Sequence, residues 1–264
     1  MIRKSLLLAG IFALSVVGAR AQEPAPTCTM TWLGHNQEFE ELLRTADVVS
    51  VEDVGMGVTH PKKVVLKKGD LTFKAAFKPI SRGRHKGFWE SYEAEVAAYE
   101  VDKLLGLNMV PPTIVRRIGP DNGSLQLWVE NCKLYKEMMN QPPPNPVEWS
   151  HQLSRMKMFD NLIKNQDRNA QNFLVDPDWH IVLIDHSRAF ISGKKIEKEA
   201  KKLPTQFDRA LVEKMKSLSL EELDSQLKDL LFGGLVKDLI GRRDDLLDYL
   251  NKLVAKNGEA QVLF

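Results

Sequence analysis

The chain has 264 residues, of which 43% are hydrophobic and 27% are charged, and its formal net charge is +2. This apolar content is ordinary for a globular core, and the length suits one two-lobed domain or two small ones. The small net charge argues against a nucleic-acid partner, because such proteins usually carry a stronger and clustered basic excess.

The first 21 residues have the pattern of a signal peptide. Arg3 and Lys4 are followed by an apolar run over residues 5–18, and Ala19–Ala21 fits the small-x-small cleavage rule. We expect cleavage after Ala21 and export to the periplasm or the extracellular space. An uncleaved anchor is the alternative, although the run is short for a transmembrane helix. No later segment is long and apolar enough to span a membrane.

The only two cysteines are Cys28 and Cys132. In an oxidising compartment such a pair can form a disulfide, which would tie the mature N-terminus to the middle of the chain. Two separate thiols are the alternative interpretation.

The segment after the cleavage site begins with a Pro-containing leader and a short helix predicted over Glu38–Ala46. Two β-branched stretches follow, from Val48 and up to Leu66, with Gly55 and Gly57 between them. A Gly-x-Gly turn lets backbone amides approach phosphates closely, although a plain hairpin turn is the commoner meaning.

Residues 71–79 alternate between apolar and polar side chains, as a half-buried strand does, and Lys74 and Lys78 share its polar face. A basic loop is expected at Ser81–Gly87, where a solvated run is the simpler interpretation. Trp89–Gly106 is predicted to be a helix with a mainly apolar arc. Its Glu95 lies beside apolar surface and therefore requires a nearby cation, with Glu90 and Glu93 as the alternative carboxylates.

Two short strands, Thr113–Arg117 and Leu125–Glu130, are expected on either side of a turn at Gly119–Ser124. The Pro-rich stretch Gln141–Pro146 suits neither a helix nor a central strand, and we interpret it as a rigid connector.

The stretch from Met158 to Phe190 carries the chemistry. A helix ends before a polar loop at residues 165–171, and two apolar runs joined by an Asp-Pro-Asp turn lead to Asp185. This layout holds Asp167, Asn172 and Asp185 close together. Phosphoryl transfer uses such a trio, in which one carboxylate orients the attacking hydroxyl while an oxygen ligand and a second carboxylate hold magnesium. A polar turn without chemistry is the alternative.

The segment Asn165–Asn172, followed by Ile184 and Asp185, resembles the atypical kinases with an Asp-Arg catalytic loop. These include the Golgi secretory-pathway kinases, the CotH kinases, the HipA kinases and the type II phosphatidylinositol 4-kinases. Many members have His after Asp-Arg where this chain has Asn169, which leaves the base position Asp167 and the metal positions Asn172 and Asp185 intact.

The resemblance implies an α+β, two-lobed protein-kinase-like fold, with a small β-rich N-lobe that holds one main helix and a mostly helical C-lobe. The expected divisions are a signal peptide at 1–21, a leader and short helix at 22–47, the N-lobe at 48–132 and the C-lobe at 133–264.

The resemblance also implies the site residues and their roles. Asp167 would be catalytic and Arg168 would brace its loop; Asn172 and Asp185 would bind Mg²⁺ or Mn²⁺; and the nucleotide would be held by Gly55, Gly57, Lys78 and Glu95.

The resulting hypothesis is an exported ATP-dependent phosphotransferase whose acceptor is a hydroxyl of a protein, a lipid headgroup, a sugar or a small molecule. One alternative is a non-catalytic kinase-like binding module. Another is nucleotidyl transfer on the same fold.

Overall fold

The computed structural model describes residues 30–55 and 61–264. The predicted signal peptide, Cys28 and Gly57 lie outside the described residues. The elements follow one another in the order α1 (Asn36–Thr45), β1 (Asp47–Asp53), β2 (Lys62–Lys68), β3 (Leu71–Lys78), β4 (Gly83–His85), β5 (Phe88–Glu90), α2 (Tyr92–Leu105), β6 (Thr113–Ile118), β7 (Asp121–Leu127), β8 (Lys133–Leu134), α3 (Tyr135–Met138), α4 (Pro146–Ile163), β9 (Phe173–Val175), β10 (Ile181–Leu183), a 3₁₀ turn (Ala200–Lys202), α5 (Arg209–Ser217), α6 (Leu220–Leu227), α7 (Leu235–Asn257) and α8 (Glu259–Val262).

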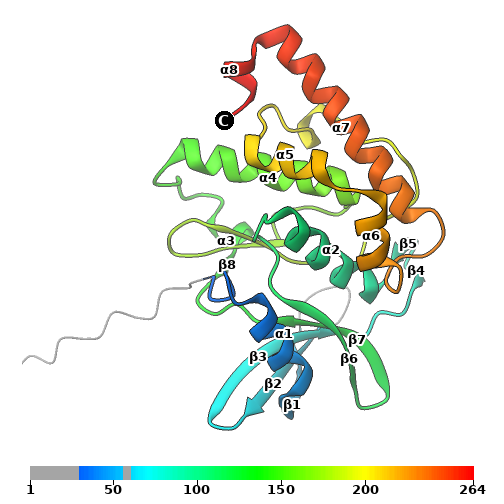
Figure 1. Cartoon of the computed structure of the whole chain (residues 1–264). Helices are drawn as coiled ribbons and strands as arrows, with labels where there is room; N and C mark the ends of the chain where they lie inside the picture. The colour runs from blue at the N-terminus through cyan, green and yellow to red at the C-terminus, as the bar shows by residue number, and fades with distance from the viewer. Residues whose placement is uncertain (1–29, 56–60) are drawn as a thin grey trace, which may run out of the picture.

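A five-stranded antiparallel sheet with the order β1-β2-β3-β7-β6 forms the lower part of the molecule in Figure 1. Its strand β3 has the predicted alternation, because Ala75 and Phe77 are buried while Lys74 and Lys78 lie on the opposite face. Helix α1 packs on this sheet through Leu43, which joins the same hydrophobic cluster as Phe77. The sheet therefore presents Lys78 at the end of a strand that is anchored on its other face.

Helix α2 lies between the sheet and the helices of the C-terminal part (Figure 1). Ser91 caps its start by accepting a hydrogen bond from the backbone N–H of Ala94, at 3.1 Å. Gly106 ends it in the left-handed conformation, with φ +62°, as glycine does at helix C-termini. Ala97 and Val101 are fully buried in the hydrophobic core of the C-terminal helices. Glu95 on this helix is thus carried into the interior between the two parts of the molecule.

The structure corrects the prediction for residues 81–91. The expected basic loop and the first residues of the expected helix form the hairpin β4–β5, in which Arg84 pairs with Trp89. Lys86 and Gly87 both have positive φ, which suits the two-residue turn of a hairpin. The prediction was wrong because strands of three residues are too short to show an alternating pattern.

The predicted turn at Gly119–Ser124 is also wrong in its extent. Ile118 already pairs with Asp121, so strand β7 includes most of the predicted turn. At Gly123 a Cβ atom would lie 2.6 Å from the carbonyl oxygen of Lys78 and 2.7 Å from the ring of Phe77. Glycine at this position therefore permits the close approach of two strands.

The C-terminal part begins around the long helix α4. Asn145 caps this helix and Pro146 occupies its first turn, which agrees with a Pro-rich connector ending there. The helix ends at Ile163, and the predicted polar loop and hairpin β9–β10 follow. Strand β8 adds to this hairpin, and helices α5 to α7 complete the core. Within residues 30–55 and 61–264, the helices are each too short or too polar to cross a membrane.

Candidate active site

Lys78 at the end of β3 reaches two carboxylates from distant parts of the chain. Its Nζ lies 2.6 Å from Oε1 of Glu95 on α2 and 2.9 Å from Oδ1 of Asp185 after β10. Burial lowers the pKa of Lys78, but the charges of Asp185 and Glu95 outweigh this and raise it above its usual value. The lysine is therefore a permanent cation at the junction of sheet and helices.

Glu95 is 2% exposed and uses both of its oxygens. While Oε1 holds Lys78, Oε2 accepts the backbone N–H of His186 at 2.9 Å. Glu90 and Glu93, the other two carboxylates considered, contact Arg188 and Arg82 instead. The contacts thus favour Glu95 as the partner of Lys78.

Asp185 has a backbone φ of +61°, a conformation that Asp tolerates better than most residues and that often marks functional positions. Although burial raises the pKa of this carboxyl, the Lys78 ammonium outweighs it and lowers the pKa below its usual value. Asp185 is therefore ionised, as a metal ligand must be.

The polar loop before β9 is fixed by Arg168, which points inward. Its Nε and Nη2 donate to the two carboxylate oxygens of Asp160 at 2.9 and 3.0 Å. Its Nη1 donates to the backbone carbonyls of Asn172 and Ile184, the latter at 2.8 Å. One largely buried side chain thereby ties the loop to both ends of the hairpin, as expected of a residue that braces the loop.

His186 completes this buried network and was not predicted. It is fully buried, and burial together with the charges of Arg168 and Lys78 holds its pKa well below the usual value. The neutral ring accepts from Arg168 Nη2 through Nε2, at 2.8 Å. Its Nδ1 then carries the proton and lies 3.8 Å from Oε2 of Glu95.

Asp167 lies at the exposed end of the same loop, with 38% of its side chain accessible. Asn172 donates its side-chain N–H to the Asp167 carbonyl at 2.7 Å, and Asn165 accepts the Asp167 backbone N–H at 3.2 Å. The carboxylate itself accepts from Nη1 of Arg188 at 2.9 Å. Asp167 is therefore positioned through its backbone, and its side chain remains accessible to an acceptor.

Asn172 and Asp185, the predicted metal ligands, lie immediately before β9 and shortly after β10. The Ile184 N–H donates to the Asn172 carbonyl at 3.3 Å, and Arg168 bonds to the same carbonyl. Because the Asn172 amide nitrogen is engaged by Asp167, its side-chain oxygen is the atom left for a cation. An amide oxygen and an ionised carboxylate are hard ligands of the kind that magnesium and manganese prefer.

The remaining predicted site residues lie at or beyond the edge of the described structure. Gly55 follows β1 and has φ +69°, a conformation that favours glycine. Gly57 lies outside the described residues, so the predicted phosphate-contacting turn stays a prediction.

A second cluster of possible metal ligands lies at the turn between β9 and β10. One oxygen or nitrogen atom from each of Asp176, Asp178 and His180 lies within 4.8 Å of the others. The backbone N–H and the ring of His180 both bond to the Asp176 carboxylate, at 2.7 and 2.9 Å. The fold of the turn itself thus accounts for the closeness of these three side chains.

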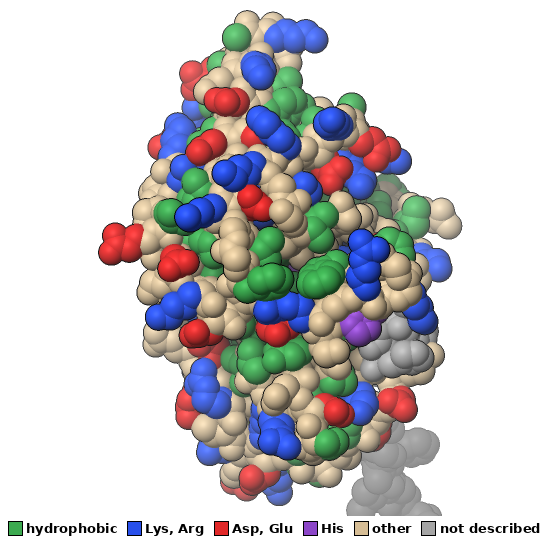
Figure 2. Space-filling view, turned by 90° about the vertical axis from the view of Figure 1, so that its right-hand side faces the viewer, with side chains coloured by type: hydrophobic (Ala, Val, Ile, Leu, Met, Phe, Trp, Pro, Cys, Tyr) green, Lys and Arg blue, Asp and Glu red, His purple; other side chains and the backbone are tan. Residues whose placement is uncertain are grey.

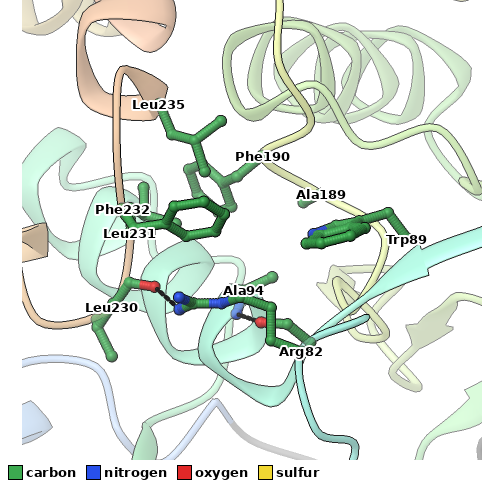
Figure 3. A pocket seen from close by; sticks show the side chains of 10 residues that line it. Arg82, Trp89, Ala94, Ala189, Phe190, Leu230, Leu231, Phe232 and Leu235 are labelled. Atoms are coloured by element: carbon green, nitrogen blue, oxygen red, sulfur yellow. Dashed lines mark hydrogen bonds between the residues drawn. The ribbon is translucent and has the colours of Figure 1, made fainter. Parts of the chain in front are cut away.

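An apolar pocket lies beside the active site rather than at Lys78. Trp89 and Ala189 lie on one side of it and Phe190, Phe232 and Leu235 on the other, and Arg82 donates to the Leu230 carbonyl at its edge (Figure 3). The face in Figure 2, on the side where Figure 1 labels β4, β5 and α6, shows hydrophobic side chains gathered near Lys and Arg side chains.

Sequence reasoning missed Asp160, His186 and Arg188. Asp160 lies in α4, where a single acidic residue carries no signal. His186 directly follows Asp185 and Arg188 lies three residues after it, so their closeness in sequence to the predicted metal ligand was the available clue.

Comparison with known proteins agrees with this geometry. The phosphatidylinositol 3- and 4-kinase family matches residues 43–257. A crystal structure of the proinflammatory kinase CtkA from Helicobacter pylori superimposes with a TM-score of 0.52 over 82% of this chain and 96% of that chain, at 12% identity. Protein Rv2133c of Mycobacterium tuberculosis is 28% identical over 153 residues, which cover 45% of this chain and only about half, 54%, of that protein.

These findings define a kinase-like protein, and the predicted two-lobed kinase-like fold is confirmed. The chain belongs to the phosphatidylinositol 3- and 4-kinase family. The more specific resemblance to the Golgi, CotH and HipA kinases and to the type II phosphatidylinositol 4-kinases stays a prediction.

Proposed function

We propose that the protein is an ATP-dependent phosphotransferase that transfers the γ-phosphate to a hydroxyl acceptor. The observation that carries the proposal is the arrangement around Lys78. A cation from the sheet is held by Glu95 of the main helix and contacts Asp185, which the catalytic loop braces through Arg168.

In the proposed reaction, Lys78 and the amides around Gly55 and Gly57 hold the phosphates of ATP. A divalent cation, Mg²⁺ or Mn²⁺, supplies neutralisation of phosphate charge, and Asn172 and Asp185 are its proposed ligands. Asp167 orients the acceptor hydroxyl and takes its proton. As the acceptor oxygen bonds to the γ-phosphorus, the bond to the β–γ bridging oxygen breaks and ADP leaves with that electron pair.

The acceptor is the open part of the proposal. The family's name makes phosphatidylinositol in vesicles the first acceptor to try. Protein, sugar and small-molecule hydroxyls follow, because specificity depends on loops that differ among proteins with one fold.

We also propose that the protein is exported, with cleavage after Ala21, a Cys28–Cys132 disulfide and a lobe boundary between residues 132 and 133. Intact mass spectrometry of the secreted or periplasmic protein, with and without reductant, tests the first two points. A mature chain that begins at Gln22 and gains two protons on reduction is expected. A chain that retains Met1 in the cytoplasm would contradict export.

The experiment that tests the activity measures the masses of all products formed from ATP and the acceptor with Mg²⁺ or Mn²⁺. A gain of one phosphate is expected, and Asp167→Ala should lower turnover by orders of magnitude, since positioning supplies most of this catalysis. Asp178→Ala is the matched control, because Asp178 is an exposed aspartate at the β9–β10 turn. A gain of nucleotide would indicate nucleotidyl transfer, and no gain would indicate a binding module. Unchanged turnover in Asp167→Ala would remove that residue from the mechanism.

A further inference from the structure

Arg188 joins the predicted catalytic carboxylate to the hairpin β4–β5. Its Nη1 lies 2.9 Å from Oδ2 of Asp167, and its Nε lies 2.6 Å from Oε1 of Glu90, a carboxylate that is 4% exposed. The guanidinium carbon lies 4.0 Å from the centre of the Phe88 ring. Two ion pairs and one aromatic face therefore hold this guanidinium in place before any substrate binds.

The other cations of the site are committed elsewhere. Arg168, next to Asp167 in sequence, points inward to Asp160 and two backbone carbonyls. Lys78 is held by Glu95 and Asp185. Within residues 30–55 and 61–264, Arg188 is the cation whose side chain contacts the Asp167 carboxylate.

The Arg188 guanidinium lies close to the expected path of the phosphoryl group during transfer. An acceptor hydroxyl that is hydrogen-bonded to Asp167 lies about 3 Å from it, and the attacked phosphorus lies about 3–3.5 Å beyond. A guanidinium bonded to the same carboxylate is within reach of the equatorial oxygens of that phosphoryl group. Nε and Nη1 hold the two carboxylates, and within the described part of the chain Nη2 makes no contact that would keep it from a phosphate oxygen.

We propose that Arg188 is a catalytic residue that binds the γ-phosphoryl group of ATP and neutralises the charge that develops on it. The planar fork of arginine suits phosphate oxygens, whereas a lysine would bind as a point charge. Arginines that stabilise the transferring phosphoryl group contribute about 10³–10⁵ in turnover. The inference rests on the proposed phosphotransfer and adds a residue to it.

A comparison of the binding of two nucleotides distinguishes a catalytic role of Arg188 from a purely structural one. Calorimetry with Mn²⁺ should compare ADP with a non-hydrolysable ATP analogue for the wild type, Arg188→Ala and Arg188→Lys. In Arg188→Ala, we expect the preference for the triphosphate to fall at least about tenfold, with ADP affinity unchanged, and turnover to fall about 10³-fold. Arg188→Lys should recover part of the preference and part of the turnover.

The matched control is Arg155→Ala. Arg155 also bridges two carboxylates, Asp208 at 2.7 Å and Glu148 at 2.9 Å, and it also lies near an aromatic ring, that of Phe264. This variant loses the same kinds of contact in α4 and should keep both the nucleotide preference and the turnover of the wild type.

The outcomes separate the two proposals. If the wild type binds neither nucleotide, the proposed function fails and this inference fails with it. If the wild type binds both while Arg188→Ala keeps the triphosphate preference, only this inference fails. A rise in turnover in Arg188→Ala would also overturn it, since Arg188 would then be restraining Asp167. Should Arg188→Ala not fold, the lysine variant decides, and wild-type preference and turnover in that variant would refute the role.

Discussion

Replacement of Glu95 by Gln tests whether the Lys78 contacts stabilise the junction between the sheet and the helices. The glutamine keeps the size of the side chain but has one acceptor oxygen for two donors, the Lys78 ammonium and the His186 N–H. Removing one partner of a buried ion pair costs about 3–5 kcal/mol. Because Lys78 keeps Asp185, we expect the lower end, about 3 kcal/mol.

The assay is urea unfolding and thermal unfolding of four proteins: the wild type, Glu95→Gln, Lys78→Met and the double variant. For a protein of this size, a loss of about 3 kcal/mol lowers Tm by about 6–12 °C. The double variant should lose less than the sum of the singles, with a coupling free energy of about 1–3 kcal/mol.

Strand β3 supplies the control for this experiment. Lys74 pairs with Glu130 at 2.8 Å, but the two side chains are 41% and 55% exposed. Glu130→Gln should therefore change the free energy of unfolding by less than about 1 kcal/mol. A similar small change in Glu95→Gln, or zero coupling with Lys78, would refute the reasoning.

Three further predictions concern the supports of the site. Asp160→Asn removes a buried carboxylate from the largely buried Arg168 and should cost about 3 kcal/mol of stability by urea unfolding; a loss below about 1 kcal/mol would contradict this. Burial raises the pKa of Asp102 to about 7 from 3.8, so its contribution to stability is fully present below about pH 4 and is lost as pH rises towards 7. Relative to Asp102→Asn, the wild type should lose on the order of 4 kcal/mol between these pH values, and equal slopes would be inconsistent with the raised pKa. Arg242→Met removes the buried donor to the Leu162 carbonyl at the end of α4 and should destabilise the protein by about 1–3 kcal/mol in the same assay. A more stable variant would contradict this, because the unfavourable burial of the charge would then exceed the stabilisation from its hydrogen bonds.

The parts of the fold that were predictable are those in which a local pattern decides the structure. The alternation over residues 71–78 placed Lys78 on the face opposite Phe77, because successive side chains of a strand point to opposite faces. The periodicity of α2 and the apolar surroundings of Glu95 likewise indicated that this carboxylate needed a cation.

The parts that were missed depend on contacts between distant segments. The hairpin β4–β5 has strands of three residues, so its pairing leaves no readable alternation. Gly123 looked like a turn glycine, but its role is to let β7 approach Lys78 on β3. Arg188 meets Asp167 and Glu90 only in the folded chain, and no spacing in the sequence announces those contacts.

Thermal unfolding of the mature protein with ATP and Mn²⁺ tests most directly whether the site works as a metal–nucleotide site. Ligand at about a hundred times Kd should add about 2.7 kcal/mol, which raises Tm by about 5–10 °C in a protein of this size. Asp185→Asn is the informative variant, since Asn tolerates the φ of +61° at this position but lacks the charge. The account predicts a metal-dependent shift in the wild type that is lost in Asp185→Asn. No shift with any nucleotide and metal, or an equal shift in both proteins, would contradict it.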